Sequence, residues 1–133
     1  IRVSYITFNG KRGNHMDCKY QLKDGCMRIS MPKEVDHHNA EQLKKEADLL
    51  IGAYHIQKLI FDFAGTEFMD SSGIGLVMGR YRLIREWNGS VEIHNPAPSI
   101  KKVMRLAGLD RIASIHSSPP KSGTNSTKTE AKI

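Results

Sequence analysis

The stretch KLIFDFAGTEFMDSSGIGLVMGRYRLI, residues 58–84, changes character twice along its length. It begins with a nearly continuous apolar run, which is typical of a strand covered on both faces of a sheet. Polar residues and glycine then interrupt that run at DSSG, residues 70–73. Apolar residues return at helical intervals, at Ile74, Val77, Met78, Tyr81 and Ile84. The stretch therefore predicts a buried strand, an exposed loop and a helix that ends near Asn88-Gly89.

The segment before this strand predicts a hairpin and a helix. CKYQL (18–22) and CMRISM (26–31) alternate apolar and polar residues on either side of the turn residues KDG, which is typical of a β-hairpin. From Ala40 the apolar residues follow helical spacing. Asp36 and Asn39 are both suited to cap this helix, and Gly52 is suited to end it.

The segment after residue 89 predicts two strands and a third helix. SVEIH (90–94) and RIASI (111–115) have strand character. A helix is expected to begin at about Ser99, after two prolines, and to end at Gly108, with Val103, Met104 and Ala107 on one face. The order β-β-α-β-α-β-α-β predicts an α/β fold with a mixed, mainly parallel sheet of four to five strands and helices packed against it. DSSG then lies beyond the carboxyl end of a strand, where such sheets bind ligands.

The length of 133 residues predicts one domain, which we place at residues 16–116. Residues 1–15 are expected to be an upstream extension or a vector-derived segment. Residues 117–133, SSPPKSGTNSTKTEAKI, are polar and lack apolar periodicity, which predicts a disordered tail.

The net charge of +6 lies at the ends of the chain rather than in the predicted domain. Residues 1–15 hold three basic and no acidic residues, and residues 116–133 hold three basic and one acidic residue, which leaves 14 basic against 13 acidic residues between them. A domain with nearly equal numbers of basic and acidic residues has no strong positive potential to attract a phosphate backbone, which argues against nucleic-acid binding. No apolar run approaches the roughly 20 residues of a membrane span. The N-terminus lacks the layout of a secretory signal, so we expect a cytoplasmic protein with no membrane partner.

The cysteines and histidines offer no recognisable metal or cofactor pattern. Cys18 and Cys26 flank the predicted hairpin turn, and without a signal peptide reduced thiols are favoured over a disulfide across it. The neighbouring His37 and His38 point in different directions on a helix, and no Cys-x-x-Cys or His-x-x-x-His partner is present. Both histidines are expected to be surface or cap residues, so no metal and no cofactor is predicted.

DSSG itself has three interpretations from chemistry alone. Aspartate and serine cap helices by accepting hydrogen bonds from the first backbone N–H groups. Gly73, Gly75 and Gly79 follow a strand as in a nucleotide cradle, but their spacing is one residue too long for the dinucleotide fingerprint and no P-loop is present. A serine nucleophile is disfavoured because the Gly-x-Ser-x-Gly elbow is absent. The chain has no constellation of base, nucleophile and orienting residue, so we do not expect an enzyme.

Three stretches together carry a resemblance to a known family. EVDHHNAEQLKKEADLLI (34–51), the stretch at residues 58–84, and IHNPAPSIKKVMRLAGLDRI (93–112) resemble an anti-sigma factor antagonist of the STAS family, closest to the sporulation type. The resemblance implies that the unphosphorylated form captures an anti-sigma factor that is also a serine kinase, and so frees the sigma factor. Phosphorylation by that kinase switches the antagonist off, and a phosphatase of the PP2C type resets it.

The resemblance also implies which residues act. Ser71, the first serine of the motif, is the expected phosphoacceptor. The expected partner-binding surface consists of Asp36, His37, Asp70, Ser72, Gly73, Ile74 and Gly75. Ser72 is expected to serve as a cap or a partner contact. A phosphate on Ser71 would be opposed by Asp70, and Gly73 and Gly75 would keep side chains away from the partner. A non-switching STAS scaffold, as in a stressosome or a transporter-associated complex, is the alternative.

Overall fold

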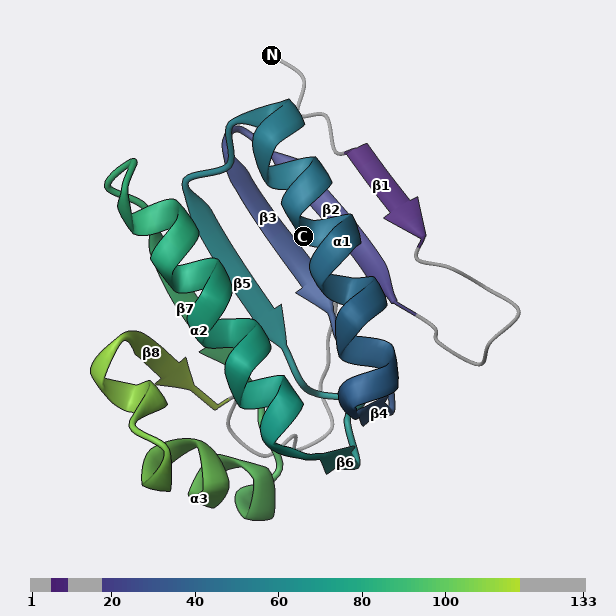
Figure 1. Ribbon diagram of the computed structural model, residues 1–133, viewed down its shortest axis with the longest axis vertical. Coiled ribbons are helices and arrows are strands. Elements are labelled where there is room, and N and C mark those ends of the chain that lie inside the picture. Colours follow the sequence, from purple (N-terminus) through teal and green to yellow (C-terminus); the bar gives the residue numbers. More distant parts are fainter. Residues whose placement is uncertain (1–5, 10–17, 118–133) are drawn as a thin grey trace, which may run out of the picture.

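The computed structural model describes residues 6–9 and 18–117 and shows a sheet with helices across one face (Figure 1). The main sheet has six strands in the order β1 (Ile6–Asn9), β2 (Lys19–Lys23), β3 (Cys26–Ser30), β5 (Lys58–Asp62), β7 (Ser90–His94) and β8 (Ala113–His116). The first three pair antiparallel and the remaining pairs are parallel. The predicted α/β class with a mixed, mainly parallel sheet is therefore confirmed, with more strands than the four to five expected.

The hairpin of β2 and β3 turns where the sequence predicted it. Asp24 and Gly25 both have left-handed backbones, with φ of 49° and 77°, as a two-residue type I′ turn requires. Alternate residues of the two strands, Tyr20, Leu22, Met27 and Ile29, are buried in the core. Cys18 is also buried and Cys26 is half-buried, and no disulfide joins these two described residues, which confirms the preference for thiols.

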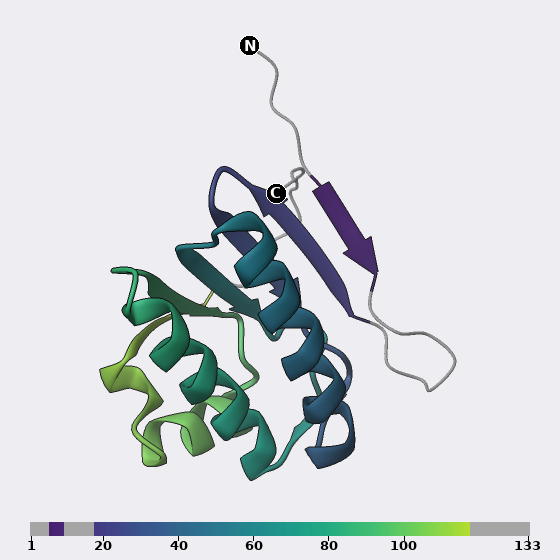
Figure 2. The ribbon, with the colours of Figure 1, turned by 45° about the horizontal axis from the view of Figure 1, so that its top comes forward.

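Two long helices cover the sheet. α1 (His37–Tyr54) and α2 (Ser71–Arg85) lie side by side across one face in both views (Figures 1 and 2), followed by the shorter α3 (Pro98–Leu106) and the 3₁₀ turn Leu109–Arg111. Their apolar sides meet the core-facing side chains of the strands, which include Leu59, Phe61, Val91 and Ile93. Among residues 6–9 and 18–117, no helix covers the opposite face of the sheet.

The one-sided cover corrects the expectation that the strand at residues 58–63 is buried on both faces. In β5, Leu59 and Phe61 are buried, whereas Ile60 and Asp62 are only half-buried on the opposite face. The long apolar run arises because Phe63, just beyond the strand, is also fully buried. The apolar run therefore corresponds to a strand covered by helices on one face, together with the buried residue that follows the strand.

The helices α1 and α3 agree with the predictions only in part. α1 begins at His37 with Asp36 as its cap, which is one of the two caps that the sequence suggested. It continues through Gly52 and ends at His55, whose backbone is left-handed with φ of 52°. In α3 the buried residues are Ile100 and Met104, spaced one helical turn apart. Of the predicted face, Met104 is therefore correct, whereas Val103 and Ala107 are exposed.

Three short strands were not predicted. β1 lies within residues 1–15, the segment set apart as an extension, and pairs with β2, with the Phe8 ring centroid 6.0 Å from that of Tyr54. β4 (Glu34–Val35) and β6 (Phe68–Met69) form a separate parallel pair. The final strand, β8, begins two residues later than expected because the 3₁₀ turn precedes it. The predicted disorder of the tail concerns residues that, apart from Ser117, lie outside those the structure describes.

Candidate functional site

The parallel pair of β4 and β6 brings the starts of α1 and α2 together. Val35 lies opposite Met69 in the register, and the next residue of each strand, Asp36 and Asp70, stands immediately before a helix. The backbone N–H of Asp70 also donates to the carbonyl of Val35 at 3.1 Å. The two aspartates therefore occupy equivalent places at neighbouring helix starts, although 34 positions separate them in the sequence.

Both aspartates cap their helices through the side chain. Asp36 Oδ1 accepts a hydrogen bond from the backbone N–H of Asn39 at 2.9 Å, and Asp70 Oδ1 accepts one from the N–H of Ser72 at 2.8 Å. The capping interpretation is thus correct for Asp70, whereas Ser72 does not cap the helix. Because Asp70 is the cap, residues 71–73 form the first turn of α2 rather than the expected loop.

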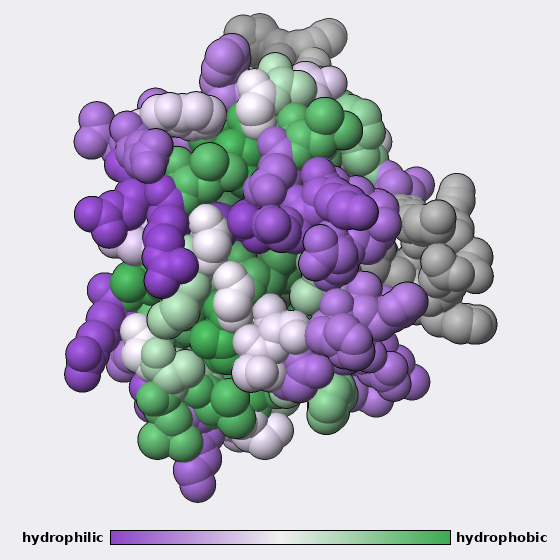
Figure 3. Space-filling model, in the orientation of Figure 1, coloured by the Kyte–Doolittle hydropathy of each residue, from purple (hydrophilic) through white to green (hydrophobic). Residues whose placement is uncertain are grey.

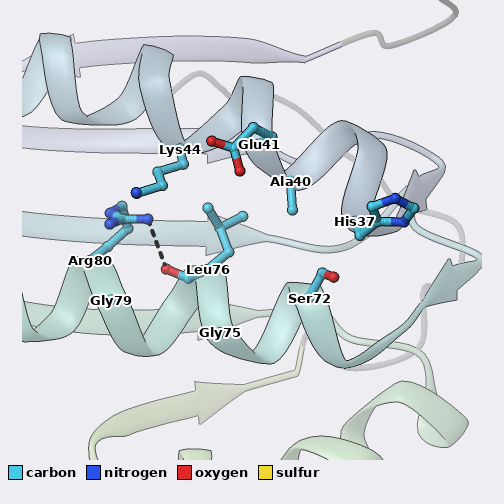
Figure 4. Close-up of a pocket in the computed structure, with 9 residues that line it drawn as sticks. All are labelled: His37, Ala40, Glu41, Lys44, Ser72, Gly75, Leu76, Gly79 and Arg80. Atoms are coloured by element: carbon cyan, nitrogen blue, oxygen red, sulfur yellow. Dashed lines mark hydrogen bonds between the residues drawn. The ribbon is translucent and has the colours of Figure 1, made fainter.

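Ser71 is the first residue of α2, and it is exposed. It is therefore accessible at a helix N-terminus, where unsatisfied backbone N–H groups favour negative charge. Ser72 is half-buried and points towards α1 (Figure 4). The two neighbouring serines thus face different surroundings, the first solvent and the second the space between the helices.

Two of the predicted site residues lie in the interior. Gly73 is buried, and a Cβ built on it would contact Met69 Cγ and lie 2.6 Å from Met69 Sδ and 3.1 Å from Val35 Cγ1. Ile74 is buried in the core. Gly75 is exposed, with no atom within 4 Å of a built Cβ. Gly73 therefore allows β4 and β6 to approach α2. Gly75 leaves the exposed side of α2 without a projecting side chain at that position.

A groove between the two helices adjoins this helix start, and its volume is about 350 Å³ (Figure 4). It is lined by His37, Ala40, Glu41 and Lys44 from α1 and by Ser72, Gly75, Leu76, Gly79 and Arg80 from α2. Arg80 is almost fully buried and holds the helices together, with its Nε 2.9 Å from Asp48 Oδ1 of α1. Small residues and mixed charges thus line a groove that opens beside Ser71.

Exposed apolar residues on β6 and α3 were not recognised from the sequence. Phe68 of β6 is 52% exposed, two residues before the cap. On α3, Leu106 is 80% exposed, and Figure 3 shows apolar surface over the lower part of the molecule, where α3 lies. The available signal for Phe68 was a large apolar residue between Glu67 and the polar motif. Such residues are typical of protein contact surfaces.

The six-stranded mixed sheet, its one-sided helices and the paired helix starts define a class of small α/β domain. The chain belongs to the STAS domain family, whose pattern matches residues 18–121. It is similar to the anti-sigma F factor antagonist of Paenibacillus polymyxa, with 27% identity over 92 residues that cover 69% of this chain and 79% of that protein. It is also similar to that of Lysinibacillus sphaericus, with 38% identity over 76 residues, or 57% of this chain and 65% of the relative.

Solved structures show the same likeness. The anti-sigma factor antagonist SpoIIAA in its unphosphorylated form matches with a TM-score of 0.63 and 27% identity, over 84% of this chain and 87% of that one. The Bacillus cell fate determinant SpoIIAA in its phosphorylated form matches with a TM-score of 0.58 and 27% identity, over 84% and 90% of the two chains. Among the described residues of this chain, no helix has the length and apolarity to cross a membrane.

Proposed function

We propose that this protein is an anti-sigma factor antagonist of the sporulation type, which acts in the cytoplasm and is controlled by phosphorylation of Ser71. The unphosphorylated form binds an anti-sigma factor that is a serine kinase, and so releases the sigma factor. The observation that carries the proposal is the exposure of Ser71 at the first position of α2, beside two aspartate caps and a groove. The similar proteins named as anti-sigma factor antagonists support it.

The proposed docking surface comprises the exposed or half-buried residues around the two helix starts, namely Asp36, His37, Asp70, Ser71, Ser72 and Gly75. Gly73 and Ile74 lie beneath it and set its shape rather than contacting the partner. Phe68 adds an exposed apolar anchor at its edge. A surface of one aromatic anchor among small and charged residues suits a specific protein partner.

Phosphorylation would change this surface mainly through charge. A phosphoserine carries about −1.5 to −2 charges at pH 7. The N-terminus of α2 favours that charge, but Asp70 already accepts the hydrogen bond of the Ser72 N–H, so the phosphate would compete with the cap. Asp36, at the neighbouring helix start, adds a second negative charge. The modified surface therefore becomes strongly negative without refolding of the domain.

The size of this effect is enough for a switch. Two unit charges 4 Å apart interact by about 4 kcal/mol at an effective dielectric of 20 and by about 1 kcal/mol in bulk water. Repulsion of that order from an acidic group on the partner would lower its affinity by roughly fivefold to a thousandfold. A phosphatase of the PP2C type would reverse the change, since the modified hydroxyl stays exposed at the helix start.

The proposal is tested by incubating the protein with ATP and a sporulation-type anti-sigma factor kinase, followed by phosphopeptide mapping. We expect a single phosphate on Ser71 and none on Ser72, which faces the groove. Ser71→Ala should abolish labelling, while Ser72→Ala should retain it. Stable binding of the partner without any phosphorylation would instead favour a non-switching STAS scaffold, such as a stressosome or transporter-associated module.

A further inference from the structure

The face of the sheet opposite α1 and α2 carries a cluster of two histidines and a glutamate. Glu92 and His94 are alternate residues of β7, so their side chains project from the same face. His116 of β8 lies opposite His94 in the register of the two parallel strands. The three side chains therefore form a triangle on neighbouring strands, and the rings of the two histidines are 5.1 Å apart.

The atoms of this triangle that can bind a metal ion are close together. One nitrogen of each histidine and one carboxylate oxygen lie within 4.8 Å of one another. Glu92 Oε1 is 2.9 Å from His94 Nε2, and His116 Nε2 is 2.9 Å from the hydroxyl of Ser114. In a tetrahedral zinc site, ligand atoms about 2.0–2.2 Å from the ion are roughly 3.4 Å apart, so small side-chain rotations suffice.

We propose that Glu92, His94 and His116 form a binding site for Zn²⁺ or a similar borderline divalent transition metal. Two imidazoles and one carboxylate are the ligand set of several three-residue zinc sites, which leave a fourth position to water or another ligand. The site lies on the side of the sheet away from the Ser71 surface, so it does not depend on the proposed antagonist function.

Two cations border the site, and they set its expected affinity. Lys58 Nζ is 3.0 Å from Glu92 Oε2 and competes with a metal for this carboxylate, but its side chain is about half exposed and can turn to solvent. Arg28 approaches His94 Nδ1 at 3.5 Å and is itself paired with Asp62 at 2.7 Å, which offsets its charge. Lys58 is therefore the main electrostatic opponent of a bound metal.

Glu92 and Arg28 approach the ring of His94 at its two different nitrogens, Glu92 Oε1 at Nε2 and Arg28 Nη1 at Nδ1. A metal at His94 Nε2 would leave a proton on Nδ1, so the guanidinium of Arg28, which lies 3.5 Å from that nitrogen, would have to turn aside. Asp62, the register partner of His94 on β5, is paired with Arg28 at 2.7 Å.

The residue spacing of this site differs from the metal-binding motifs Cys-x-x-Cys and His-x-x-x-His. Here Glu-x-His and Ser-x-His, residues 92–94 and 114–116, follow the period of two of neighbouring strands. Only the pairing of β7 with β8 brings them together, since more than 20 residues separate the two histidines.

The test is isothermal titration of chelator-treated, full-length protein with ZnCl₂. We expect one ion per chain, and we expect Glu92→Gln and His116→Ala each to weaken binding at least tenfold. Lys58→Gln should strengthen binding, because it removes the competing cation. His38→Ala, which removes an exposed histidine on α1, is the matched control and should leave binding unchanged. Thermal unfolding of each metal-free variant checks that the fold is retained.

A second readout reports the ligands directly. Co²⁺ in place of zinc should give visible d–d absorption typical of a four- or five-coordinate nitrogen and oxygen site, and His116→Ala should abolish it. The proposal is overturned if zinc does not bind, or if binding is equally tight in wild type, Glu92→Gln and His116→Ala. It is also overturned if His38→Ala is the variant that removes binding, because the ion would then sit at the start of α1.

Discussion

Replacing Gly73 by alanine tests the packing that places Ser71. The added methyl would contact the side chains of Met69 and Val35, lying 3.1 Å from Val35 Cγ1. Val35 is fully buried and cannot move aside, whereas Met69 is half-buried and flexible. Overpacking of a core costs about 1–3 kcal/mol, and because Met69 can yield we expect about 1–2 kcal/mol here.

The matched control is Gly52→Ala. Gly52 also lies inside a helix, but nothing is within 4 Å of a built Cβ, so only the gain of alanine over glycine remains, about 0.5–1 kcal/mol. Because both variants share that gain, the difference between them isolates the contact with Met69 and Val35. At roughly 4–8 °C per kcal/mol for a domain of this size, Gly73→Ala should melt at least about 4 °C below Gly52→Ala.

Thermal unfolding followed by circular dichroism measures this difference. The phosphorylation rate of Ser71 in the Gly73→Ala protein should also fall, because the start of α2 has to shift. Equal melting temperatures for the two variants would show that β4 and β6 do not approach α2 as closely as the structure places them.

Three further predictions follow from other parts of the molecule. Phe8→Ala should lower stability by about 1–3 kcal/mol through lost contact with Tyr54, and an unchanged denaturant midpoint would place β1 outside the folded unit. Tyr20 is buried and donates to Glu46 at 2.7 Å, which raises its pKa far above the ordinary value. Since the unfolded chain loses this proton first, stability should fall as pH rises above about 10, and a Tyr20→Phe protein that shows the same slope would contradict this. Gly75→Ala should raise stability by about 0.5–1 kcal/mol while weakening partner binding, and unimpaired binding would exclude Gly75 from the docking surface.

The longer elements could be predicted because each carries one regular period. The alternation in residues 18–31 and the turn residues Asp24-Gly25 are sufficient for the hairpin, and the structure has it in that register. The start of α1 was less certain, because Asp36 and Asn39 are both good caps. In the structure they cooperate, with Asp36 accepting from the Asn39 N–H. Residue preference alone does not distinguish a cap from a residue that donates to it.

The geometry of the site depends on long-range contacts, which produce no periodic pattern of apolar residues in the sequence. β4 and β6 have two residues each, which is too short for alternation. Long-range hydrogen bonds hold them, including one from the hydroxyl of buried Thr66 to the carbonyl of Pro32 at 2.8 Å. The sequence therefore identified DSSG as the candidate functional motif, but it could not show that residues 71–73 form a helical turn or that Gly73 is buried.

We propose that the charge on Ser71 controls partner binding. The most direct measurement is titration of wild type, Ser71→Ala and Ser71→Asp proteins against the anti-sigma factor kinase, with circular dichroism as the folding control. Altering an exposed residue at a helix start costs only about 0.5–2 kcal/mol, so both variants should fold. We predict that Ser71→Ala binds like the unphosphorylated wild type and that Ser71→Asp binds at least fivefold more weakly. A folded Ser71→Asp protein that binds as tightly as Ser71→Ala would contradict control by charge at this position.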